Sequence, residues 1–317
     1  EVEKLLPNVV GHSMNLKGIV KEVKTTKKKK RPPQLHSLSS LQTLANKKYK
    51  YSPSKVLDIV QSLYDHPLNL VTYPRTKTQY ITTNEFHYLR ENLNSYQSLM
   101  DLSFQPKSTE PDKRFVDNQK VQEHYAIIPT KKIPSKELLS QLKEEQRNIY
   151  FEIVKSVLAM FHDDLHYEET EIFTEVNGLT FHTKGSIIQS LGWKELFKEQ
   201  NEDTKDTILP PVIEGMECLS ELEITEGKTS APKPFTEGQL INVMKYCGKY
   251  VDDLDETSNE ILKDIEGLGT EATRSGIIET LKKQNYIEIK KNNVYVTKKG
   301  VILCQAVEGT LLSKPEM

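Results

Sequence analysis

The stretch Asn69-Leu70-Val71-Thr72-Tyr73-Pro74-Arg75-Thr76 places a tyrosine and an arginine two residues apart, with a proline between them. Pro74 fixes its own φ and disfavours helical geometry at Tyr73, so the stretch is expected to be extended. In an extended chain, residues i and i+2 point to the same side, so Tyr73 and Arg75 should face one ligand. A phenol can attack phosphorus and a guanidinium can bind phosphate oxygens, which suits a phosphodiester. Simple packing of a tyrosine on a strand is the alternative that the octapeptide leaves open.

Composition sets the broad class of protein. The chain has 317 residues, 36% of them hydrophobic and 28% charged, which predicts two or three domains with much surface per core residue. A formal net charge of −2 gives no overall basic field, so nucleic-acid binding must be sought locally. Cys218, Cys247 and Cys304 are far apart, which argues against a zinc ribbon or a disulfide framework and fits a reducing compartment. No apolar run approaches the length needed to span a membrane.

The first part of the chain changes from strand to helix periodicity. Residues 9–23 alternate loosely and predict a β-strand, and the lysine run at 24–33 is expected to be a solvated loop or, alternatively, a phosphate-contacting edge. From Ser37 onward apolar residues recur at helical spacing, and Ser52-Pro53 suits the start of a second helix. Two helices joined by a short turn are therefore predicted before the tyrosine stretch. The pattern Thr82-x-x-Glu85 predicts a capping box that opens a third helix.

The second part returns to strands and then to helices. Residues 138–161 predict one or two helices, and 168–227 predict a β-rich lobe with a hairpin turn at Asn177-Gly178 and a later strand at 217–225. The N-terminal strands could belong to the same lobe, which would make the helical block an insertion. An exposed acidic turn is expected at 201–206.

Helices return from Pro232, and Thr236 and Gln239 predict another capping box. The last helix is followed by a predicted hairpin of 286–289 and 294–297 joined by Asn292-Asn293. A helix followed by a hairpin is typical of winged-helix modules, which bind nucleic acids or proteins.

Four motifs in a fixed order resemble the type IA DNA topoisomerases, most of all the topoisomerase III branch. The resemblance covers nearly the whole chain, including the lead-in Pro32-Pro33-Gln34-Leu35. Each motif alone is a weak signal, whereas four in order are a strong one. The motifs are Leu70-Val71-Thr72-Tyr73-Pro74-Arg75-Thr76, His124-Tyr125-Ala126-Ile127-Ile128-Pro129-Thr130, Pro234-Phe235-Thr236-Glu237-Gly238 and Gly267-Leu268-Gly269-Thr270-Glu271-Ala272-Thr273-Arg274.

The resemblance implies a catalytic role for three residues. Tyr73 would attack a single-strand phosphodiester, form a 5′-phosphotyrosine and free a 3′-hydroxyl. One phosphodiester replaces another, so no ATP is needed. Arg75 would stabilise charge that develops on the phosphate. His124 matches the family histidine near the scissile phosphate, with a role in phosphate contact or proton transfer; a lone histidine would more often be structural.

Two of the motifs also suggest contacts with DNA. Helix N-termini with hydroxyls and free N–H groups bind phosphates, and both the Thr-Glu and the Gly-rich motifs open helices. Plain N-capping is the alternative role for the threonines, and the two roles are compatible. Among this group Arg274 is expected to meet DNA most directly. The DNA-binding candidates are Thr236, Glu237, Thr270, Thr273, Arg274 and Lys77.

The implied fold is a multi-domain α+β type IA topoisomerase core. Residues 1–36 with 165–230 would form a β-rich arch lobe, 37–164 a helical gate lobe with Tyr73, and 231–317 a helical lobe with a hairpin wing that lines a single-strand groove. The lobes would close a ring in the complete enzyme, and the Tyr73 lobe would swing as a gate. Single-stranded DNA and a passing strand or duplex are the implied partners, with no membrane partner. A monomer in the bacterial cytoplasm, associated with nucleoid or plasmid, is expected.

Three departures from the family pattern affect these expectations. Lys77 and Thr78 follow the tyrosine motif where Asp-Ser is usual, and Pro234 stands where some relatives have arginine. The acidic metal-binding (TOPRIM) domain is absent, and the nearest acidic run, residues 252–256, has the wrong spacing and predicts a solvated turn. Because the chain begins at Glu1 rather than Met, it is expected to be a fragment whose full-length form uses Mg²⁺ held by the missing domain. The fragment should bind no metal, bind single-stranded DNA weakly and not relax supercoils.

Two other functions remain open at this point. His87-Tyr88-Leu89-Arg90 matches the His-x-x-Arg pattern of tyrosine recombinases and type IB enzymes, with Tyr125 downstream. Such an enzyme would be joined to the 3′ end of the cut strand rather than the 5′ end. A non-catalytic winged-helix DNA-binding module would explain the hairpin but not the order of motifs, and it would prefer duplex DNA.

Overall fold

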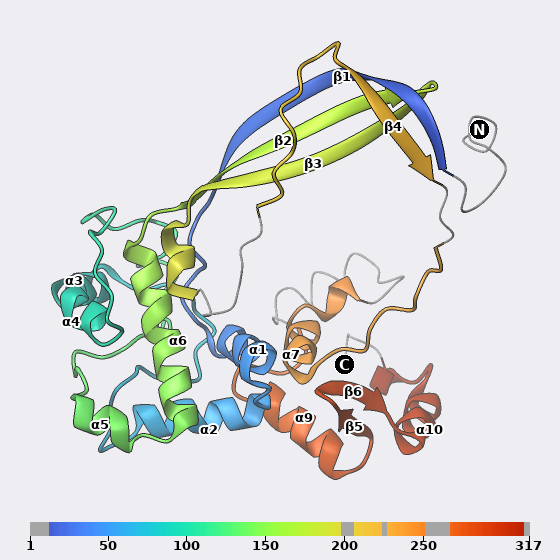
Figure 1. Cartoon of the computed structure of the whole chain (residues 1–317). Coiled ribbons are helices and arrows are strands. Elements are labelled where there is room, and N and C mark those ends of the chain that lie inside the picture. Colours follow the sequence, from blue (N-terminus) through green and yellow to red (C-terminus); the bar gives the residue numbers. More distant parts are fainter. Residues whose placement is uncertain (1–12, 198–205, 224–226, 251–266, 314–317) are drawn as a thin grey trace. The chain divides into compact units, whose positions relative to one another are not determined.

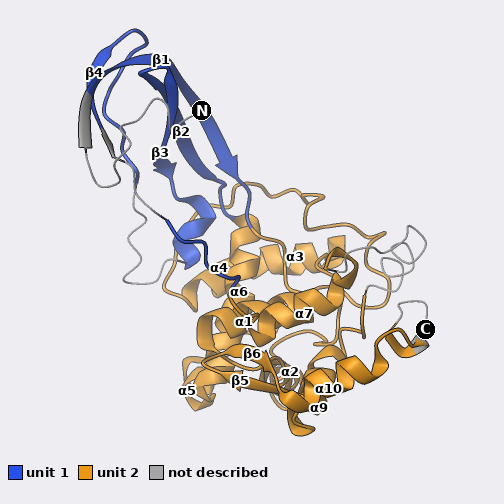
Figure 2. Ribbon diagram, turned by 90° about the vertical axis from the view of Figure 1, so that its right-hand side faces the viewer, with its two compact units in different colours: residues 1–32, 162–232 blue, residues 33–161, 233–317 orange. Residues whose placement is uncertain are grey.

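The computed structural model describes residues 13–197, 206–223, 227–250 and 267–313. These residues belong to two compact units, each made of two separate stretches of the chain (Figure 2). The first unit comprises 1–32 and 162–232, and the second comprises 33–161 and 233–317. The acidic run at 252–256 and nearly all of the acidic turn predicted at 201–206 lie outside the described residues. The three-lobe division with boundaries at 36, 164 and 230 stays a prediction.

The first unit is built on one antiparallel sheet with the strand order β3-β2-β1-β4 (Figure 1). Because β1 lies between β2 and β4, strands from both ends of the long helical block share a sheet. The turn between β2 and β3 falls at Asn177 and Gly178, whose φ angles of 50° and 76° are those of a type I′ hairpin, as predicted. The elements of this unit are β1 (Ser13–Lys30), β2 (Leu165–Val176), β3 (Leu179–Ser190), a 3-10 helix η2 (Gly192–Phe197) and β4 (Glu217–Glu223).

The lysine run is part of this sheet, so the prediction of a solvated loop there was wrong. Strand β1 continues through Lys30 and pairs with the acidic first half of β2, with Lys24 opposite Glu171 and Lys27 opposite Glu168. Opposite charges across a strand pair contribute about 0.2–1 kcal/mol each, and like charges would repel. A run that looks like loop by composition therefore becomes strand because its partner strand carries the opposite charge.

The second unit holds the helices, and its first segment follows the predicted pattern. Ser52 and Thr82 accept hydrogen bonds at the starts of α2 and α3, and Thr82 with Glu85 forms the predicted capping box. The region 138–161 forms two helices, and the longer one, α6, buries the predicted apolar stripe, including Ile149, Ile153 and Val157. The helices are α1 (Leu38–Tyr49), α2 (Pro53–Tyr64), α3 (Thr83–Glu91), α4 (Leu93–Ser98), α5 (Lys136–Gln141) and α6 (Glu144–Phe161).

The last segment of this unit forms helices around a short hairpin. Ile241, Met244 and Ile278 form its small buried cluster. The hairpin turn falls at Lys291 and Asn292, with φ angles of 50° and 69°, one residue earlier than predicted, because Lys290 pairs with Asn293. The elements are α7 (Glu237–Lys245), η3 (Cys247–Lys249), α9 (Arg274–Lys283), β5 (Ile287–Lys290), β6 (Asn293–Val296), α10 (Lys298–Val307) and η4 (Leu311–Ser313). Among the described residues, no helix is both long and apolar enough to cross a membrane.

A buried histidine at the start of this unit makes its stability depend on pH. The His36 imidazole lies 3.3 Å from the hydroxyl of Ser40, and burial lowers the pKa of the ring to about 4. The unfolded chain takes up a proton near pH 6.5, whereas the folded chain resists protonation until about pH 4. Protons therefore bind the unfolded state preferentially between these values, and stability falls as the pH decreases through this window.

We predict that His36→Gln reduces this pH dependence. In the wild type, the His36 contribution should lower the free energy of unfolding by about 3 kcal/mol between pH 6.5 and 4. Urea unfolding at pH 7, 5.5 and 4.5 measures the difference. His87→Gln, at an exposed position on α3, is the matched control and should keep the wild-type slope. Equal slopes for wild type and His36→Gln would contradict the prediction.

Candidate active site

The tyrosine stretch and the histidine motif are joined by backbone and side-chain hydrogen bonds. The amide of Thr72 donates to the Ile128 carbonyl over 3.0 Å, and the amide of Thr130 donates to the Leu70 carbonyl over 2.9 Å. The Thr72 hydroxyl donates to the Ala126 carbonyl and accepts from the Ile128 amide, both over 3.0 Å. Thr72 is buried, so these bonds fix the register of the two motifs.

This pairing places the Tyr73 ring against the His124 ring. Their centroids are 4.2 Å apart, with a 33° angle between the ring planes. Tyr64, the last residue of α2, meets Tyr73 edge-on at 5.7 Å. Tyr73 is half-buried and His124 is exposed. Two residues proposed from motifs about fifty positions apart are therefore direct neighbours.

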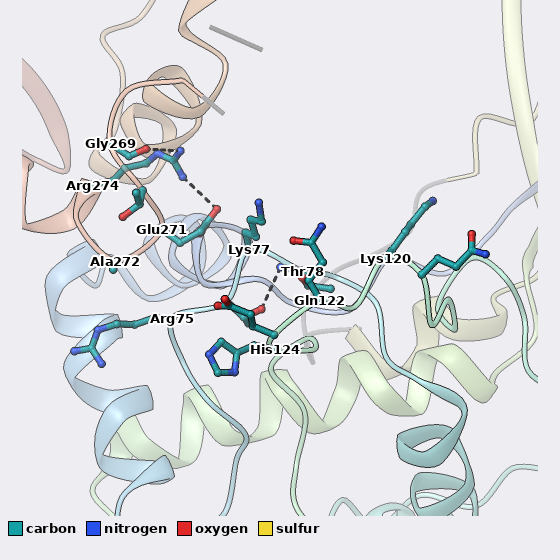
Figure 3. A pocket seen from close by; sticks show the side chains of 14 residues that line it. Arg75, Lys77, Thr78, Lys120, Gln122, His124, Gly269, Glu271, Ala272 and Arg274 are labelled. Atoms are coloured by element: carbon teal, nitrogen blue, oxygen red, sulfur yellow. Dashed lines mark hydrogen bonds and ion pairs between the residues drawn. The ribbon is translucent and has the colours of Figure 1, made fainter. Parts of the chain in front are cut away.

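The contacts of Arg75 differ from those of Tyr73, and the expectation that both face one ligand stays a prediction. The stretch pairs with the histidine motif through the bridge of Val71 with Pro129 and then bends at Pro74 and Arg75, so strict alternation of i and i+2 is not expected beyond Tyr73. Arg75 Nη1 instead donates to Gln61 Oε1 on α2 over 2.6 Å. In Figure 3 its side chain extends away from His124. Tyr73 and Arg75 line different cavities, and His124 lines both.

The larger cavity, of about 730 Å³, lies among three segments of the second unit. These are residues 75–78 after the tyrosine, 119–124 before the histidine, and 269–274 in the Gly-rich motif (Figure 3). Lys77 and Lys120 are exposed on its walls. Lys120 Nζ lies 3.1 Å from the Tyr80 hydroxyl and lowers the pKa of that phenol. The cavity therefore joins positive side chains to the histidine motif, as an anion-binding site requires.

The Gly-rich motif is held against α1 by a buried carboxylate. Glu271 Oε2 accepts from the Ser39 amide over 2.7 Å and from the Ser39 hydroxyl over 2.5 Å. Glu271 Oε1 accepts from Lys245 Nζ over 3.0 Å and from Arg274 Nη1 over 3.2 Å. The side chains of Glu271 and Arg274 are only 6% and 1% exposed. The carboxylate thus connects α1, α7 and the start of α9.

Arg274 supports the turn of this motif in the structure. Its Nε donates to the Leu268 carbonyl over 3.1 Å and its Nη2 to the Gly269 carbonyl over 2.9 Å. Gly269 has a φ of 66°, a conformation that favours glycine. Arg274 borders the larger cavity, yet its guanidinium is buried and committed to these partners. Its expected direct contact with DNA stays a prediction, and this geometry favours a supporting role.

The other DNA-binding candidates divide into two groups. Lys77 and Thr270 line the larger cavity, whereas Thr273 does not, although its hydroxyl accepts from the Thr270 amide over 2.8 Å. Thr236 and Glu237 also lie outside that lining. Thr236 caps α7 in a capping box, and the buried Glu237 accepts from Lys282 Nζ over 2.8 Å. For Thr236, the capping alternative is the role that the structure displays.

The motifs did not single out two residues that the structure places at the site. Lys120 lies four positions before His124, and its only sequence signal is a positive charge near a motif. Tyr64 is the last residue of an amphipathic helix, where an aromatic residue is normally taken as core. The proximity of Lys120 and Tyr64 to the site is visible only in the folded structure, because their contacts join segments that are separated in the sequence.

The described residues contain no group of three or more histidine, cysteine, aspartate or glutamate residues able to hold a metal ion. Glu123 and Glu271 both border the larger cavity, but the Glu271 carboxylate is occupied by Ser39, Lys245 and Arg274. No step of the chemistry is therefore assigned to a metal held by these residues.

A family model described as DNA topoisomerase matches residues 3–317 of this chain. The chain belongs to the DNA topoisomerase family. DNA topoisomerase 3 of Haemophilus influenzae is 35% identical over 322 residues, which cover 99% of this chain and 48% of that protein. DNA topoisomerase 3 of Bacillus licheniformis is 34% identical over 306 residues, which cover 93% of this chain and 41% of that protein. The chain thus spans less than half the length of these relatives.

A solved structure has the same fold. The full-length topoisomerase I from Thermotoga maritima aligns with a TM-score of 0.64 and 23% identity, covering 92% of this chain and 45% of that chain. At this identity the likeness concerns the fold alone. Together with the relatives, it confirms the predicted type IA, topoisomerase III-like family and the α+β topoisomerase core. The His-x-x-Arg match of the recombinase alternative falls on α3, where Arg90 Nη1 donates to the Thr109 carbonyl over 3.0 Å.

We predict that Glu271→Ala strongly destabilises the second unit. The change leaves the buried Arg274 without its carboxylate partner, and breaking a buried ion pair in this way costs about 3–5 kcal/mol. Urea unfolding measures the loss. Glu288→Ala is the matched control, because its pair with Lys290 is exposed and should contribute at most about 1 kcal/mol. Similar small losses for both variants would show that the carboxylate is not a structural centre.

Proposed function

We propose that this chain carries the strand-cleaving tyrosine of a type IA DNA topoisomerase. The Tyr73 oxygen attacks phosphorus in a single DNA strand, and the bond from phosphorus to the 3′ oxygen breaks. The phenolic proton leaves, the 3′ oxygen gains a proton, and the 5′-phosphate remains on Tyr73. Attack by the 3′-hydroxyl reverses the step after a second strand has passed. Because one phosphodiester replaces another, the cycle needs no ATP.

The observation that carries this proposal is the contact of Tyr73 with His124 next to a positively lined cavity. The two rings lie 4.2 Å apart, and His124 also borders the cavity that contains Lys77 and Lys120. A strand whose phosphates follow the lysines would bring one phosphate to His124 and the Tyr73 hydroxyl. His124 is suited to contact this phosphate or to take part in the proton transfers of the reaction.

Arg75 is proposed to change partners when DNA binds. Its hydrogen bond to Gln61 is exposed, so water or a phosphate can replace it at a small free-energy cost. A rotated Arg75 would bind the phosphate oxygens and stabilise the charge that builds on them. Lys77, in the place of the usual family acid, adds a positive charge to the same wall.

The remaining proposals concern the complete protein. Mg²⁺ is proposed to act there through ligands that are not among the described residues. Single-stranded DNA is the proposed substrate, a passing strand or duplex the second DNA partner, and the lobe that bears Tyr73 the gate. The complete protein is proposed to be a monomer that works in the bacterial cytoplasm.

We predict that Tyr73→Phe abolishes covalent attachment to DNA in the complete polypeptide. The variant keeps the ring and its packing and loses only the attacking oxygen. Denaturing gels with a 3′-end-labelled single-stranded oligonucleotide measure the adduct, because the labelled downstream piece stays on the protein. Tyr51→Phe, a residue that lines neither cavity, should leave the adduct unchanged. An undiminished adduct in Tyr73→Phe would sink the assignment, and label retained from the 5′ end instead would favour the recombinase alternative.

We predict that the 317-residue chain alone binds single-stranded DNA weakly and does not relax supercoils.

Binding to single strands weakens with salt, and the logarithm of the binding constant falls against the logarithm of the salt concentration with a slope of about −0.7 per phosphate neutralised. A double variant, Lys77→Ala with Lys120→Ala, should therefore flatten the slope by about 1.4, as measured by anisotropy between 50 and 200 mM salt. The matched double variant Lys113→Ala with Lys136→Ala removes the same charge outside the cavity and should keep the slope. Preference for duplex DNA would instead support the winged-helix alternative, and relaxation by the chain alone would contradict the proposal.

A further inference from the structure

A second cavity of about 320 Å³ lies beside Tyr73, and its walls differ from those of the larger cavity. Four of its eight lining residues carry rings, namely Tyr64, Tyr73, His124 and Tyr125. The lining includes no lysine, arginine or carboxylate. Its volume falls at the lower end of the range of about 300–1,000 Å³ that is usual for small-molecule sites. We call it the ring pocket.

The chemistry of the ring pocket suits a flat, uncharged aromatic group. Tyr64 and Tyr73 meet edge to face at an interplanar angle of 81°, and the His124 ring lies against Tyr73 at 33°, so the four rings line the pocket at different angles rather than as one closed stack. Tyr125 is half-buried, and burial raises the pKa of its phenol, which keeps it neutral. Aromatic side chains bind nucleobases of any sequence by stacking. The positive side chains that a phosphate needs, Lys77 and Lys120, line the larger cavity instead.

We propose that the ring pocket receives the base of the nucleotide whose 5′-phosphate Tyr73 holds. This inference rests on the proposed cleavage by Tyr73. The covalent bond keeps that nucleotide within a few bonds of the tyrosine, so its sugar and base must occupy space next to the Tyr73 ring. His124 borders both cavities, so a phosphate at this residue has positive side chains on one side and the ring pocket on the other.

Stacking in this pocket would serve religation as well as binding. The cut 5′ end is held by one flexible link, the bond from phosphorus to the tyrosine oxygen. A base fixed in the pocket would restrict rotation about that link and hold the phosphorus in place for attack by the 3′-hydroxyl. Such positioning of reacting groups accelerates a step without a new catalytic group.

Tyr64 is the residue through which to test the pocket. Among the described residues its side chain makes no hydrogen bond or ion pair, and it contacts Tyr73 edge-on and lies close enough to Tyr125 to influence that phenol. Its backbone carbonyl accepts from Asn69 Nδ2 over 3.1 Å and is unaffected by a change of side chain. Tyr64→Leu therefore removes the ring with little expected effect on folding. Tyr64 is a positioning residue, since it is not assigned to the reacting atoms.

The test combines Tyr64→Leu with oligonucleotides that lack one base, using the complete polypeptide. Adduct formation and religation are measured with an abasic site at the nucleotide 3′ of the cut, or at the one 5′ of it. For the wild type, loss of the 3′ base should reduce adduct or slow religation about 5- to 100-fold, the range expected for one stacked base. Tyr64→Leu should show this defect with the base present, and the 3′ abasic site should add nothing further.

Two control variants and two contrary outcomes make the test decisive. Tyr64→Phe should restore wild-type behaviour, because the ring remains, and Tyr51→Leu should resemble the wild type. If the 3′ abasic site and Tyr64→Leu reduce religation independently, so that their effects multiply, the ring pocket does not hold this base although cleavage by Tyr73 stands. If no adduct depends on Tyr73, the proposed function fails and the inference fails with it.

Discussion

The rest of the site depends on the buried interactions of the Glu271 carboxylate with Ser39, Lys245 and Arg274. A buried charge is tolerated only when hydrogen bonds and opposite charges replace its lost water. Here Ser39 supplies two donors, and Lys245 and Arg274 supply the positive charge. The same contacts hold residues 269–274 at the larger cavity, so the third wall of that cavity exists because the carboxylate is satisfied. The proposed phosphate site would thus have as one wall a segment held by a carboxylate of the protein whose charge is already neutralised.

The second constraint is the pairing of residues 70–72 with 126–130, which positions the reactive groups through the backbone. Thr72 both donates and accepts across this pairing, and its burial protects the bonds from water. The side chains of Tyr73 and His124 then meet without a direct hydrogen bond to each other among the recorded contacts of the described residues. The proposed nucleophile is held by its main chain, and its hydroxyl remains available to a ligand.

Local rules predicted the parts of this fold that depend on local interactions. Capping boxes at Thr82 and Thr236 and the turn at Asn177-Gly178 follow from side chains and φ angles within four residues. The sequence-based predictions fail where the conformation of a residue depends on partners that are distant in the sequence. The lysine run is a strand because β2 is acidic, and the Arg75 side chain lies toward α2 because its Nη1 donates a hydrogen bond to Gln61 Oε1. The burial of Arg274 likewise depends on Glu271 and on carbonyls of its own turn, which no spacing rule reveals.

The contacts between the two segments of the second unit include many polar ones, which bears on the proposed gate. Asn46 Oδ1 accepts from the Gly238 amide over 3.1 Å, and the Ser54 hydroxyl donates to Glu279 over 2.9 Å. A neutral bond of this kind contributes only about 0.5–1.5 kcal/mol and a bond to a carboxylate about 1.5–3 kcal/mol, because water replaces them when the surfaces part. The buried bonds from Ser39 to Glu271 also cross between these segments and cost more to break. The C-terminal segment also keeps its own apolar cluster around Ile241. If the Tyr73 segment moves as the proposed gate, these bonds and the buried Ser39–Glu271 contacts would all have to be exchanged for bonds to water, whereas the apolar stripe of α6 would stay buried within that segment.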